Sequence, residues 1–410
     1  MGKIENIKTY NGQVLDNIFF RPMLTGKSAE ELGIKVMYNV PAPTTLHFWK
    51  RSGEVLQKYT SSGWSGGTPA DKYQKTIDLS KVKAEMAYSA EDYFSTVYEI
   101  ITSRPDVNLD DLSGSELEEA ETSLFRASIA ESIRATMWYG DASREGKLNT
   151  FDGILKHICN DALCEEQSGI VSMGYIPGGE TSEWAEKLLK RMWENSSEQL
   201  RSLRAEGNLA FFVSSDVYNA YEDALDNVAL EAAYMAKQNG RDGLYYRGIP
   251  VVDVQMNGYN DINTGLPTSF AILTDRRNLA LAVNTNDFPG TEVRMWYNPD
   301  LMENRQRAIF MAGCNYLVPE LVTIAVGAPF EDFSMTYEDG VLKIVGKLEE
   351  NSWITEFLIH GTNHAGEEVL FDENLIIEDG TAFGEYDLED WKSGVLKLYS
   401  EQGHYVEIDI

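Results

Sequence analysis

A single long amphipathic helix constrains the fold of this chain more than any other feature. Between residues 115 and 139, apolar side chains recur every three or four positions, at Leu117, Ala120, Leu124, Ala127, Ala130, Ile133 and Met137. Ser113 or Ser115 caps its start, with Glu118 in position for a capping box, and Gly140-Asp141 ends it. A helix of this length extends about 35 Å. The fold must therefore accommodate a rod.

The length and the charge of the chain limit its organisation. With 410 residues it exceeds the size at which one core stops growing, so two or three domains are expected. The net charge of −30 disfavours sequence-reading nucleic-acid binding. From Gly327 to the end there are 20 acidic and 4 basic residues, which is more than half of the excess. A domain boundary is therefore expected near Gly327.

Targeting signals and cysteine patterns are weak. The sequence contains no run of 18 apolar residues, so we expect no membrane-spanning segment, and residues 1–17 do not resemble a secretory signal. Cys159, Cys164 and Cys314 form no C-x-x-C pair. Buried free thiols in a reducing cytoplasm are the favoured interpretation, and a disulfide between Cys159 and Cys164 is the alternative.

The first 88 residues contain little that can fold alone. Residues 1–44 are punctuated by proline and glycine, with short apolar runs such as Ile18-Phe19-Phe20. Residues 45–88 contain two runs of β-forming residues, the second over 73–86, on either side of a glycine-rich tip that carries Trp64. A two-stranded ribbon is marginal in water without a packing partner. We predict that it rests on a neighbouring subunit; the alternative is a hairpin folded onto its own domain.

The remainder divides into a mixed body and an all-β end. Helices are predicted over 89–103, 184–204 and 215–225, and strands over 208–214, 245–254, 269–283 and 291–326, which indicates an α+β body. From residue 328 onward, short β runs alternate with turns every 8–12 residues, a pattern typical of a small sandwich.

Motifs for catalysis are missing from the sequence. It contains no phosphate-binding loop, dinucleotide-binding glycine pattern, zinc-protease helix or nucleophile elbow. His360 and His364 are four residues apart, but a turn is expected between them, which favours surface histidines over a metal site. Cys164 or Cys314 with His157 lacks an oxyanion loop. Acidic pairs near the end favour solvated faces, with a calcium site as the alternative. We expect no catalytic centre and no cofactor.

The order of these pieces, together with four short motifs, resembles a known family. The motifs are Met137-Trp-Tyr-Gly-Asp141 followed by Phe151-Asp-Gly-Ile-Leu155, then Phe211-Phe-Val-Ser-Ser215, and then Gly248-Ile-Pro-Val-Val252. They resemble the major capsid proteins of tailed bacteriophages, which have the Hong Kong 97-type (HK97-like) fold. The resemblance extends over residues 1–326.

The resemblance implies a division of the chain into parts. Residues 1–44 would be the N-terminal arm, 45–88 the extended loop, 89–183 with 284–326 the peripheral domain, and 184–283 the axial domain. The spine helix of the peripheral domain would span 115–139. The acidic residues 328–410 are an addition that resembles the immunoglobulin-like β domains of some phage capsids.

The resemblance also implies a structural role. The chain would assemble in the host cytoplasm into pentamers and hexamers of an icosahedral shell that encloses DNA without reading its sequence. Scaffold, portal and decoration proteins are the expected partners, and the virion the expected location. Subunit contacts are expected at Trp64, Lys58, Lys72, Phe19 and Phe20; some family members crosslink a loop lysine to an asparagine. The alternatives are an encapsulin-like nanocompartment and a glycan-binding surface protein that uses the C-terminal domain.

Overall fold

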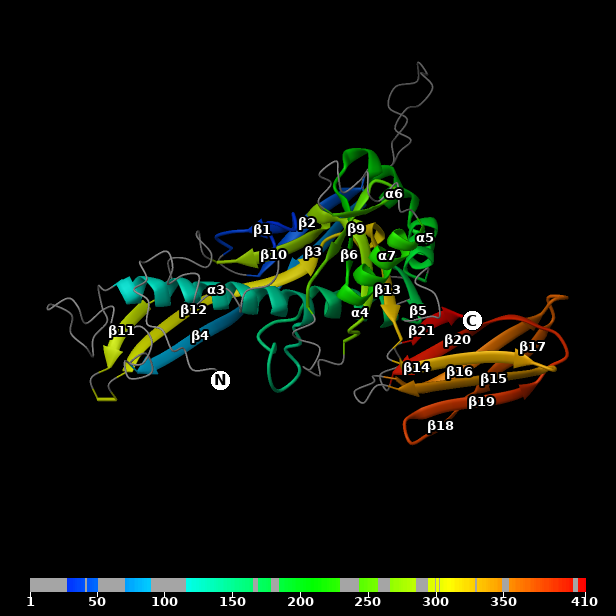
Figure 1. Ribbon diagram of the computed structural model, residues 1–410. Helices are drawn as coiled ribbons and strands as arrows, with labels where there is room; N and C mark the ends of the chain where they lie inside the picture. The colour runs from blue at the N-terminus through cyan, green and yellow to red at the C-terminus, as the bar shows by residue number, and fades with distance from the viewer. Residues whose placement is uncertain are drawn as a thin grey trace, which may run out of the picture.

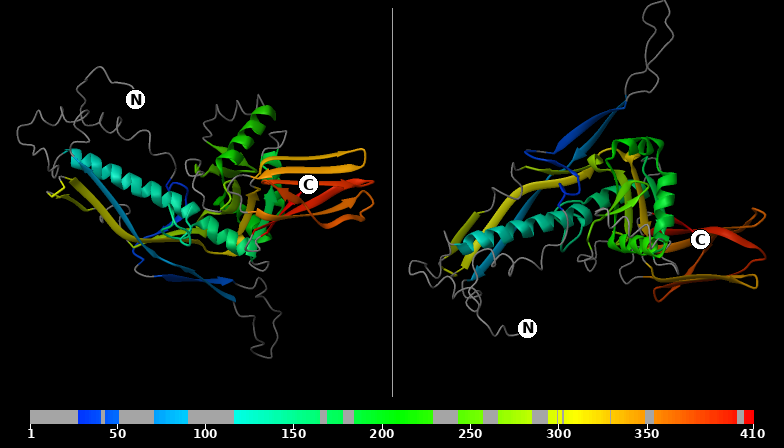
Figure 2. Two further views of the ribbon diagram at one scale, coloured as in Figure 1. Left: turned by 90° about the horizontal axis from the view of Figure 1, so that it is seen from below. Right: turned by 45° about the horizontal axis from the view of Figure 1, so that its top comes forward.

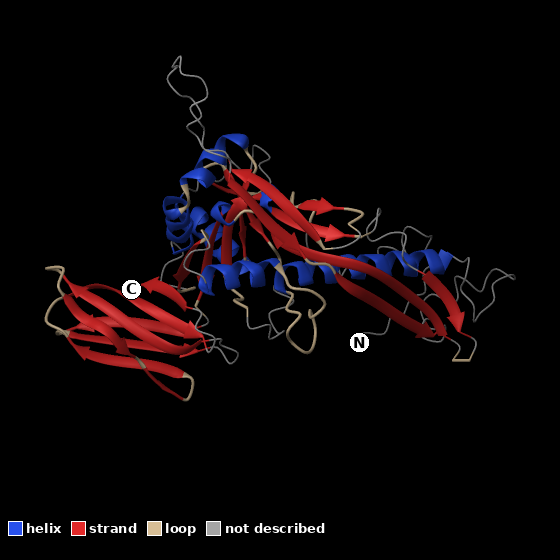
Figure 3. Cartoon of the chain, turned by 180° about the vertical axis from the view of Figure 1, so that it is seen from behind, coloured by secondary structure: helices blue, strands red, loops and turns tan. Residues whose placement is uncertain are grey.

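A computed structural model shows a mixed α+β protein, so the predicted fold class is confirmed (Figure 1). The elongated body has an all-β domain at one end, and helices and strands are interleaved along the body (Figure 3). The structure describes residues 28–40, 43–50, 71–89, 116–164, 169–177, 184–228, 243–256, 266–284, 294–298, 300–301, 303–328, 330–348, 354–400 and 405–410.

A long antiparallel sheet forms one arm of the body, and β12 (Glu303–Tyr316) is its central strand. Along one edge β12 pairs with β4 (Ser80–Ser89) over ten positions. Along the other edge it pairs first with β11 (Arg294–Asn298) and then with β10 (Leu279–Val283). A short parallel strand, β1 (Lys35–Met37), extends the sheet beside β10.

The helix α3 (Glu116–Tyr139) lies along this sheet, as Figure 2 shows. The expected helix over 115–139 is therefore present almost residue for residue. Phe125, Ile129 and Ile133 are buried in one cluster with Val82 of β4 and Phe310 of β12. The rod is thus stabilised by burying its apolar side on a sheet of matching length.

A second, six-stranded sheet fills the centre of the molecule. Its strand order is β5-β13-β9-β6-β8-β7. The bounds are β5 Val171–Tyr175, β6 Leu209–Val213, β7 Leu244–Tyr246, β8 Ile249–Asp253, β9 Phe270–Asp275 and β13 Val322–Gly327. Every residue of β6, β9 and β13 is buried, so both faces of the sheet are covered.

Different helices cover the two faces of the central sheet. Phe211 points into a cluster with α5 (Trp184–Asn195) and α7 (Ser215–Val228), whereas its neighbour Phe212 points to the opposite face. There the Phe212 ring lies 5.6 Å from Trp138, at the end of α3. Two short helices complete the body, α4 (Ile154–Cys164) and α6 (Glu198–Ser202).

Each of the two sheets of the body combines strands from both the expected peripheral and the expected axial segments. β5 and β13 fall in the expected peripheral segments but belong to the central sheet, and β10 falls in the expected axial segment but joins the long sheet. The chain passes between the sheets at Arg276–Asn278, a 3-10 turn between β9 and β10.

The prediction of one strand over 245–254 was wrong. Arg247 and Gly248 both have positive φ and form a tight hairpin between β7 and β8.

A separate two-stranded ribbon, β2 (Thr44–Lys50) and β3 (Asp71–Ile77), projects from the body (Figure 2). The returning run expected over 73–86 is divided, because β3 pairs with β2 while β4 pairs with β12. Residues 51–70 between the two strands lie outside the described residues.

The C-terminal domain is built entirely from strands, as predicted, and these form two four-stranded sheets. One sheet has the order β14-β15-β19-β18 and the other β17-β16-β20-β21. Apolar residues from both sheets, including Leu342, Phe357 and Leu396, are almost fully buried. The strand bounds are β14 Phe330–Glu338, β15 Val341–Leu348, β16 Ile354–Asn363, β17 Glu368–Asn374, β18 Ile376–Glu378, β19 Thr381–Asp387, β20 Trp391–Ser400 and β21 Tyr405–Asp409.

The C-terminal domain contacts the body through its last strand. β21 lies beside β5 of the central sheet (Figure 1). Arg191 of α5 forms an ion pair of 2.7 Å with Asp409, and the Ala328 amide donates a 2.9 Å hydrogen bond to the Tyr175 carbonyl. These contacts therefore hold the C-terminal domain in a defined position against the body.

Candidate assembly site

The base of the ribbon is fixed to the long sheet. Ile77, the last residue of β3, is fully buried in a small cluster with Ala280, Ala282 and Leu317. The side-chain amide of Asn315 donates a 3.0 Å hydrogen bond to the Thr76 carbonyl. The end of β3 is therefore attached to both β10 and β12.

A glycine allows this close attachment. A Cβ atom added to Gly313 of β12 would overlap the carbonyl oxygen of Asp78, the residue that follows β3. The backbone at the ribbon base thus runs directly across β12 at the one position without a side chain.

An ionic cluster adds a third point of attachment. The Lys75 ammonium lies 2.8 Å from an Asp161 carboxylate oxygen, 3.1 Å from the Tyr316 hydroxyl and 4.2 Å above the Tyr316 ring. The same hydroxyl donates a hydrogen bond to Asp161. Three elements, β3, α4 and β12, meet at this cluster.

Beyond its base the ribbon has no second layer in the described part of the chain. β2 and β3 form a two-stranded sheet of their own and pair with no other described strand. Thr45, Gln74 and Thr76 are exposed, and Figure 2 shows the ribbon standing away from the body. This arrangement offers unpaired strand edges to another molecule.

The residues predicted for subunit contact can be located only in part. Lys72 lies in β3, opposite Trp49 of β2. Trp64 and Lys58 lie between β2 and β3, outside the described residues, and so do Phe19 and Phe20. The structure does not bring these five residues together, and their contact roles stay predictions.

The two family-like motifs that follow the long helix form one rigid joint. The Gly153 amide donates a 2.8 Å hydrogen bond to the Gly140 carbonyl. A Cβ atom on Gly140 would overlap the Phe151 carbonyl oxygen, and one on Gly153 would lie 2.7 Å from the Gly140 nitrogen. The glycines of Gly-Asp and Asp-Gly-Ile are therefore required by the close approach of two backbones.

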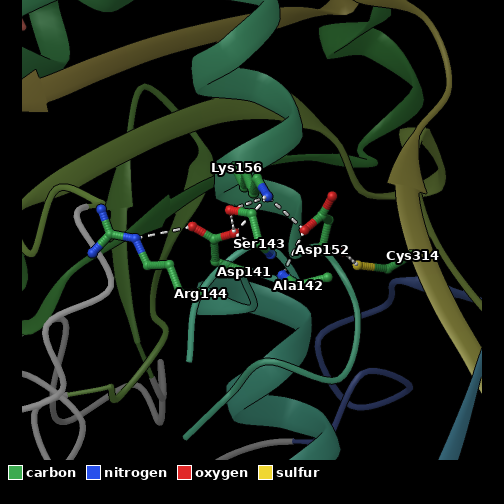
Figure 4. Close-up of polar contacts among 7 residues, drawn as sticks. All are labelled: Asp141, Ala142, Ser143, Arg144, Asp152, Lys156 and Cys314. Atoms are coloured by element: carbon green, nitrogen blue, oxygen red, sulfur yellow. Dashed lines mark hydrogen bonds and ion pairs between the residues drawn. The ribbon is translucent and has the colours of Figure 1, made fainter. Parts of the chain in front are cut away.

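The two aspartates of these motifs hold the start of α4 against the end of α3 (Figure 4). The Lys156 ammonium lies 2.5 Å from Asp141 and 2.7 Å from Asp152, and Asp141 also accepts hydrogen bonds from the Ser143 amide and hydroxyl. Arg144 approaches Asp141 at 3.2 Å. This cluster neutralises charge at a turn and has the character of a structural joint.

The protonation of the joint follows from these contacts. Burial favours the neutral form of Asp141, but hydrogen bonds from Lys156 and Ser143 outweigh it and hold the pKa of the carboxyl below its usual value. Burial likewise lowers the pKa of Lys156, but the bonds to Asp141 and Asp152 outweigh this effect and raise it. Both groups are therefore charged over a wide pH range.

Cys159 and Cys314 are buried in the core, and His157 is half-buried. Cys314 is buried, and its thiol points at the carbonyl oxygens of Met137 and Asp152, 3.6 Å and 3.3 Å away. Burial raises the pKa of the Cys314 thiol far above its usual value and lowers the pKa of His157. A thiol held neutral is a poor nucleophile. Cys159 is buried and forms no disulfide, contrary to the disulfide alternative.

The paired histidines near the end of the chain also separate. The turn expected over 361–363 was wrong, because these residues belong to β16. His360 packs against the Phe371 ring at 5.5 Å, whereas His364 lies 2.6 Å from an Asp390 carboxylate oxygen. No group of three or more potential metal ligands occurs among the described residues.

No protein-family model and no curated protein matches the sequence. The chain is similar to "The capsid of Myoviridae Phage XM1", with 11% identity and a TM-score of 0.47, over 79% of this chain and 96% of that one. It is also similar to "Satellite phage P4 procapsid including size determination (Sid) protein", with 11% identity and a TM-score of 0.47, over 78% and 92%. A third match is "Capsid of native GTA particle", with 14% identity and a TM-score of 0.44, over 74% and 92%. All three are capsids.

The residues that fix the ribbon were missed by sequence reasoning. Gly313, Asn315 and Tyr316 lie in one β run whose pattern shows only burial, and Lys75 and Asp161 are far apart in the chain. No local signal links them.

Among the described residues, no helix is both long enough and apolar enough to cross a membrane.

Proposed function

We propose that this chain is the major capsid protein of a tailed bacteriophage or prophage. In this role its copies assemble into pentamers and hexamers of an icosahedral shell that encloses DNA. The observation that carries the proposal is the β2–β3 ribbon, which is fixed at its base and pairs with no other described strand. An uncovered ribbon is marginal in water and gains stability when a neighbour supplies the second layer.

The geometry of the base favours a closed assembly. Because the ribbon is held by Ile77, Asn315 and Lys75 on one side of the subunit, it contacts a different surface on the next copy. Such heterologous contacts close into rings or shells when the rotation allows. The net charge of −30 suits a container, since its wall repels packaged DNA.

The parts of the subunit take their proposed roles from the family resemblance. Residues 1–44 act as the arm and 45–88 as the extended loop. Residues 89–183 with 284–326 form the peripheral domain, and 184–283 the axial domain. Contacts at Trp64, Lys58, Lys72, Phe19 and Phe20 join neighbours in the virion. Scaffold, portal and decoration proteins are further proposed partners. The role is structural and involves no catalytic centre.

The strand order supports an immunoglobulin-like C-terminal domain. Numbered along the chain from β14, the eight strands form sheets 1-2-6-5 and 4-3-7-8. This is the ABED and C′CFG arrangement of immunoglobulin sandwiches. We infer that the domain is a decoration added to the shell subunit.

Assembly of the purified chain tests the proposal. We expect sedimentation velocity and electron microscopy to show pentamers, hexamers or shells. Deleting residues 63–68 or changing Trp64→Ala should prevent assembly and leave the circular dichroism spectrum unchanged. The exposed Phe371→Ala in the C-terminal domain serves as the matched aromatic control. Monomers at every protein and salt concentration would contradict the proposal.

The same ribbon geometry also fits a cargo compartment without a genome. The contents of purified particles distinguish the two functions. Packaged DNA supports a phage head, whereas an enclosed enzyme without nucleic acid supports the encapsulin-like alternative.

A further inference from the structure

Along β4, β11 and β12, one face of the long sheet is covered by no element in the described part of the chain, and this open face is positively charged. The buried side chains of β12, such as Ala308 and Phe310, point toward α3, so the alternate residues point the other way. Strand register places one set of residues on this open face: Lys81, Lys83, Glu85, Arg294, Trp296, Glu303, Arg305, Arg307 and Ile309. Five of them are basic and two are acidic, in a chain whose net charge is −30.

The open face is also partly apolar and is ordered by its own contacts. Arg307 forms a 2.8 Å ion pair with Glu85 and lies 5.4 Å over the Trp296 ring. Trp296 and Ile309 remain 37% and 38% exposed. A flat surface with held cations around exposed apolar groups is suited to a macromolecular partner.

The C-terminal domain carries a surface of opposite charge. Its 20 acidic and 4 basic residues make it the most acidic part of the chain. On the outer face of the β14-β15-β19-β18 sheet, the exposed residues Val345, Phe383 and Ile376 lie in one row across three strands. The same face carries four acidic residues, Glu338, Glu378, Glu385 and Asp387, and two basic ones, Lys343 and Lys347, so it remains acidic on balance. Lys343 forms a 3.4 Å ion pair with Glu385.

These two surfaces cannot meet within one subunit. The open face lies at the end of the long sheet, and the C-terminal domain lies at the opposite end of the molecule (Figures 1 and 2). Two copies of the open face would repel each other, because like charges would face across the contact. The complement of the open face is therefore an acidic surface, and in the proposed assembly the C-terminal domain of another copy supplies one.

We propose that the open face of β4, β11 and β12 receives the acidic outer face of the C-terminal domain of a neighbouring copy. This inference rests on the proposed self-assembly and adds a second heterologous contact to the ribbon. The apolar rows of the two flat sheets pack together, and the surrounding charges pair. The contact also gives the C-terminal domain a role in joining subunits.

Charge-neutralising variants of the full chain test the contact. The open-face variant carries Arg294→Gln, Arg305→Gln and Arg307→Gln. Its control carries the same charge change at exposed positions elsewhere, Lys147→Gln, Lys187→Gln and Lys190→Gln. The partner variant carries Glu378→Gln, Glu385→Gln and Asp387→Asn.

We expect the open-face and partner variants each to need about tenfold more protein than wild type to assemble at low salt. The control should assemble like wild type. The salt dependence of wild-type assembly should weaken in both affected variants. A charge-swap variant carries Arg305→Glu and Arg307→Glu together with Glu385→Lys and Asp387→Lys in one chain. It should recover part of the lost assembly.

Other outcomes separate the claims. If wild type assembles and the open-face variant does so equally well, the contact is wrong and the proposed function stands. If only the partner variant assembles normally, the C-terminal domain is not the occupant. If short duplex DNA binds the wild-type subunit and not the open-face variant while assembly is unchanged, the face binds nucleic acid instead. If wild type never assembles, the proposed function itself fails.

Discussion

Two β regions of this protein, the β2–β3 ribbon and the C-terminal sandwich, differ in how their sheet faces are covered. The sandwich has two sheets that cover each other, and residues such as Phe357, Leu396 and Leu398 are at most 1% exposed. The ribbon has one layer, and its strands pair with no other described strand. The sandwich can thus be stable by itself, whereas in the proposed assembly the ribbon is stabilised by a neighbouring copy.

The difference separates folding from assembly. Contacts inside the sandwich lower the free energy of the single subunit. At the ribbon, three attachments fix the end of β3, while Thr45, Gln74 and Thr76 remain exposed. In the proposed assembly, a ribbon fixed in this way would lose less conformational freedom on binding a neighbour.

The largest expected effect is in the sandwich core. Phe357→Ala removes a ring that is 1% exposed, and we expect the free energy of unfolding of the C-terminal domain to fall by about 3–5 kcal/mol. Urea unfolding followed by circular dichroism and limited proteolysis measures this loss. The exposed Phe371→Ala in the same domain should change it by less than about 0.5 kcal/mol.

The contrast between sandwich and ribbon is wrong if Phe357→Ala leaves the free energy of unfolding of the C-terminal domain unchanged in the single subunit. In that case the sandwich would depend on neighbours as the ribbon does. Deletion of 63–68, by contrast, should leave the subunit's unfolding curve in place.

Sequence patterns predicted elements whose periodicity is local. The long helix was found because Leu117 to Met137 repeat at helical spacing, and the C-terminal strands because Asp339-Gly340 and Asp379-Gly380 mark tight turns with positive φ. The family-like motifs around Asp141 and Asp152 were found as strings of residues. Their joint with Lys156 emerged only from the structure, since a motif does not state which atoms meet.

Sheet membership could not be predicted in the same way. β10 and β13 are both buried on two faces and carry similar apolar runs, yet they belong to different sheets. A hydrophobic run records burial and not the identity of the neighbouring strand. The basic open face was missed for a related reason, because Lys81, Arg294 and Arg305 come together through strand pairing alone.

A glycine substitution at the ribbon base gives an intermediate effect. In Gly313→Ala the new methyl group meets the Asp78 backbone, which cannot move without displacing β3. We expect a loss of about 1–3 kcal/mol in subunit stability, together with impaired assembly. Thermal unfolding and sedimentation measure the two effects.

Gly384→Ala in β19 is the matched control for that variant. There the new methyl group meets only the side chains of Leu375 and Tyr386, which can rotate away. A smaller loss of stability and normal assembly are expected. Equal effects at Gly313 and Gly384 would show that the ribbon base is not a special point of contact.

The smallest expected effect is a pH-dependent change in the stability of the body. It should leave the stability of the sandwich unchanged. α4 contributes Lys156 to the joint and Asp161 to the ribbon base, so the two are mechanically linked. Because the pKa of Asp141 is lowered on folding, its contribution to stability is complete above the unfolded value of about 4 and is lost as pH falls below it. Asp141→Asn should cost about 1 kcal/mol at neutral pH and less in acid. Hydrogen exchange of α4 and of β16, measured at neutral and acid pH, should show this loss in α4 alone. An equal loss in β16 would mean that the body and the sandwich unfold as one unit. The sandwich would then not be stable independently of the body, and its contrast with the ribbon would fail.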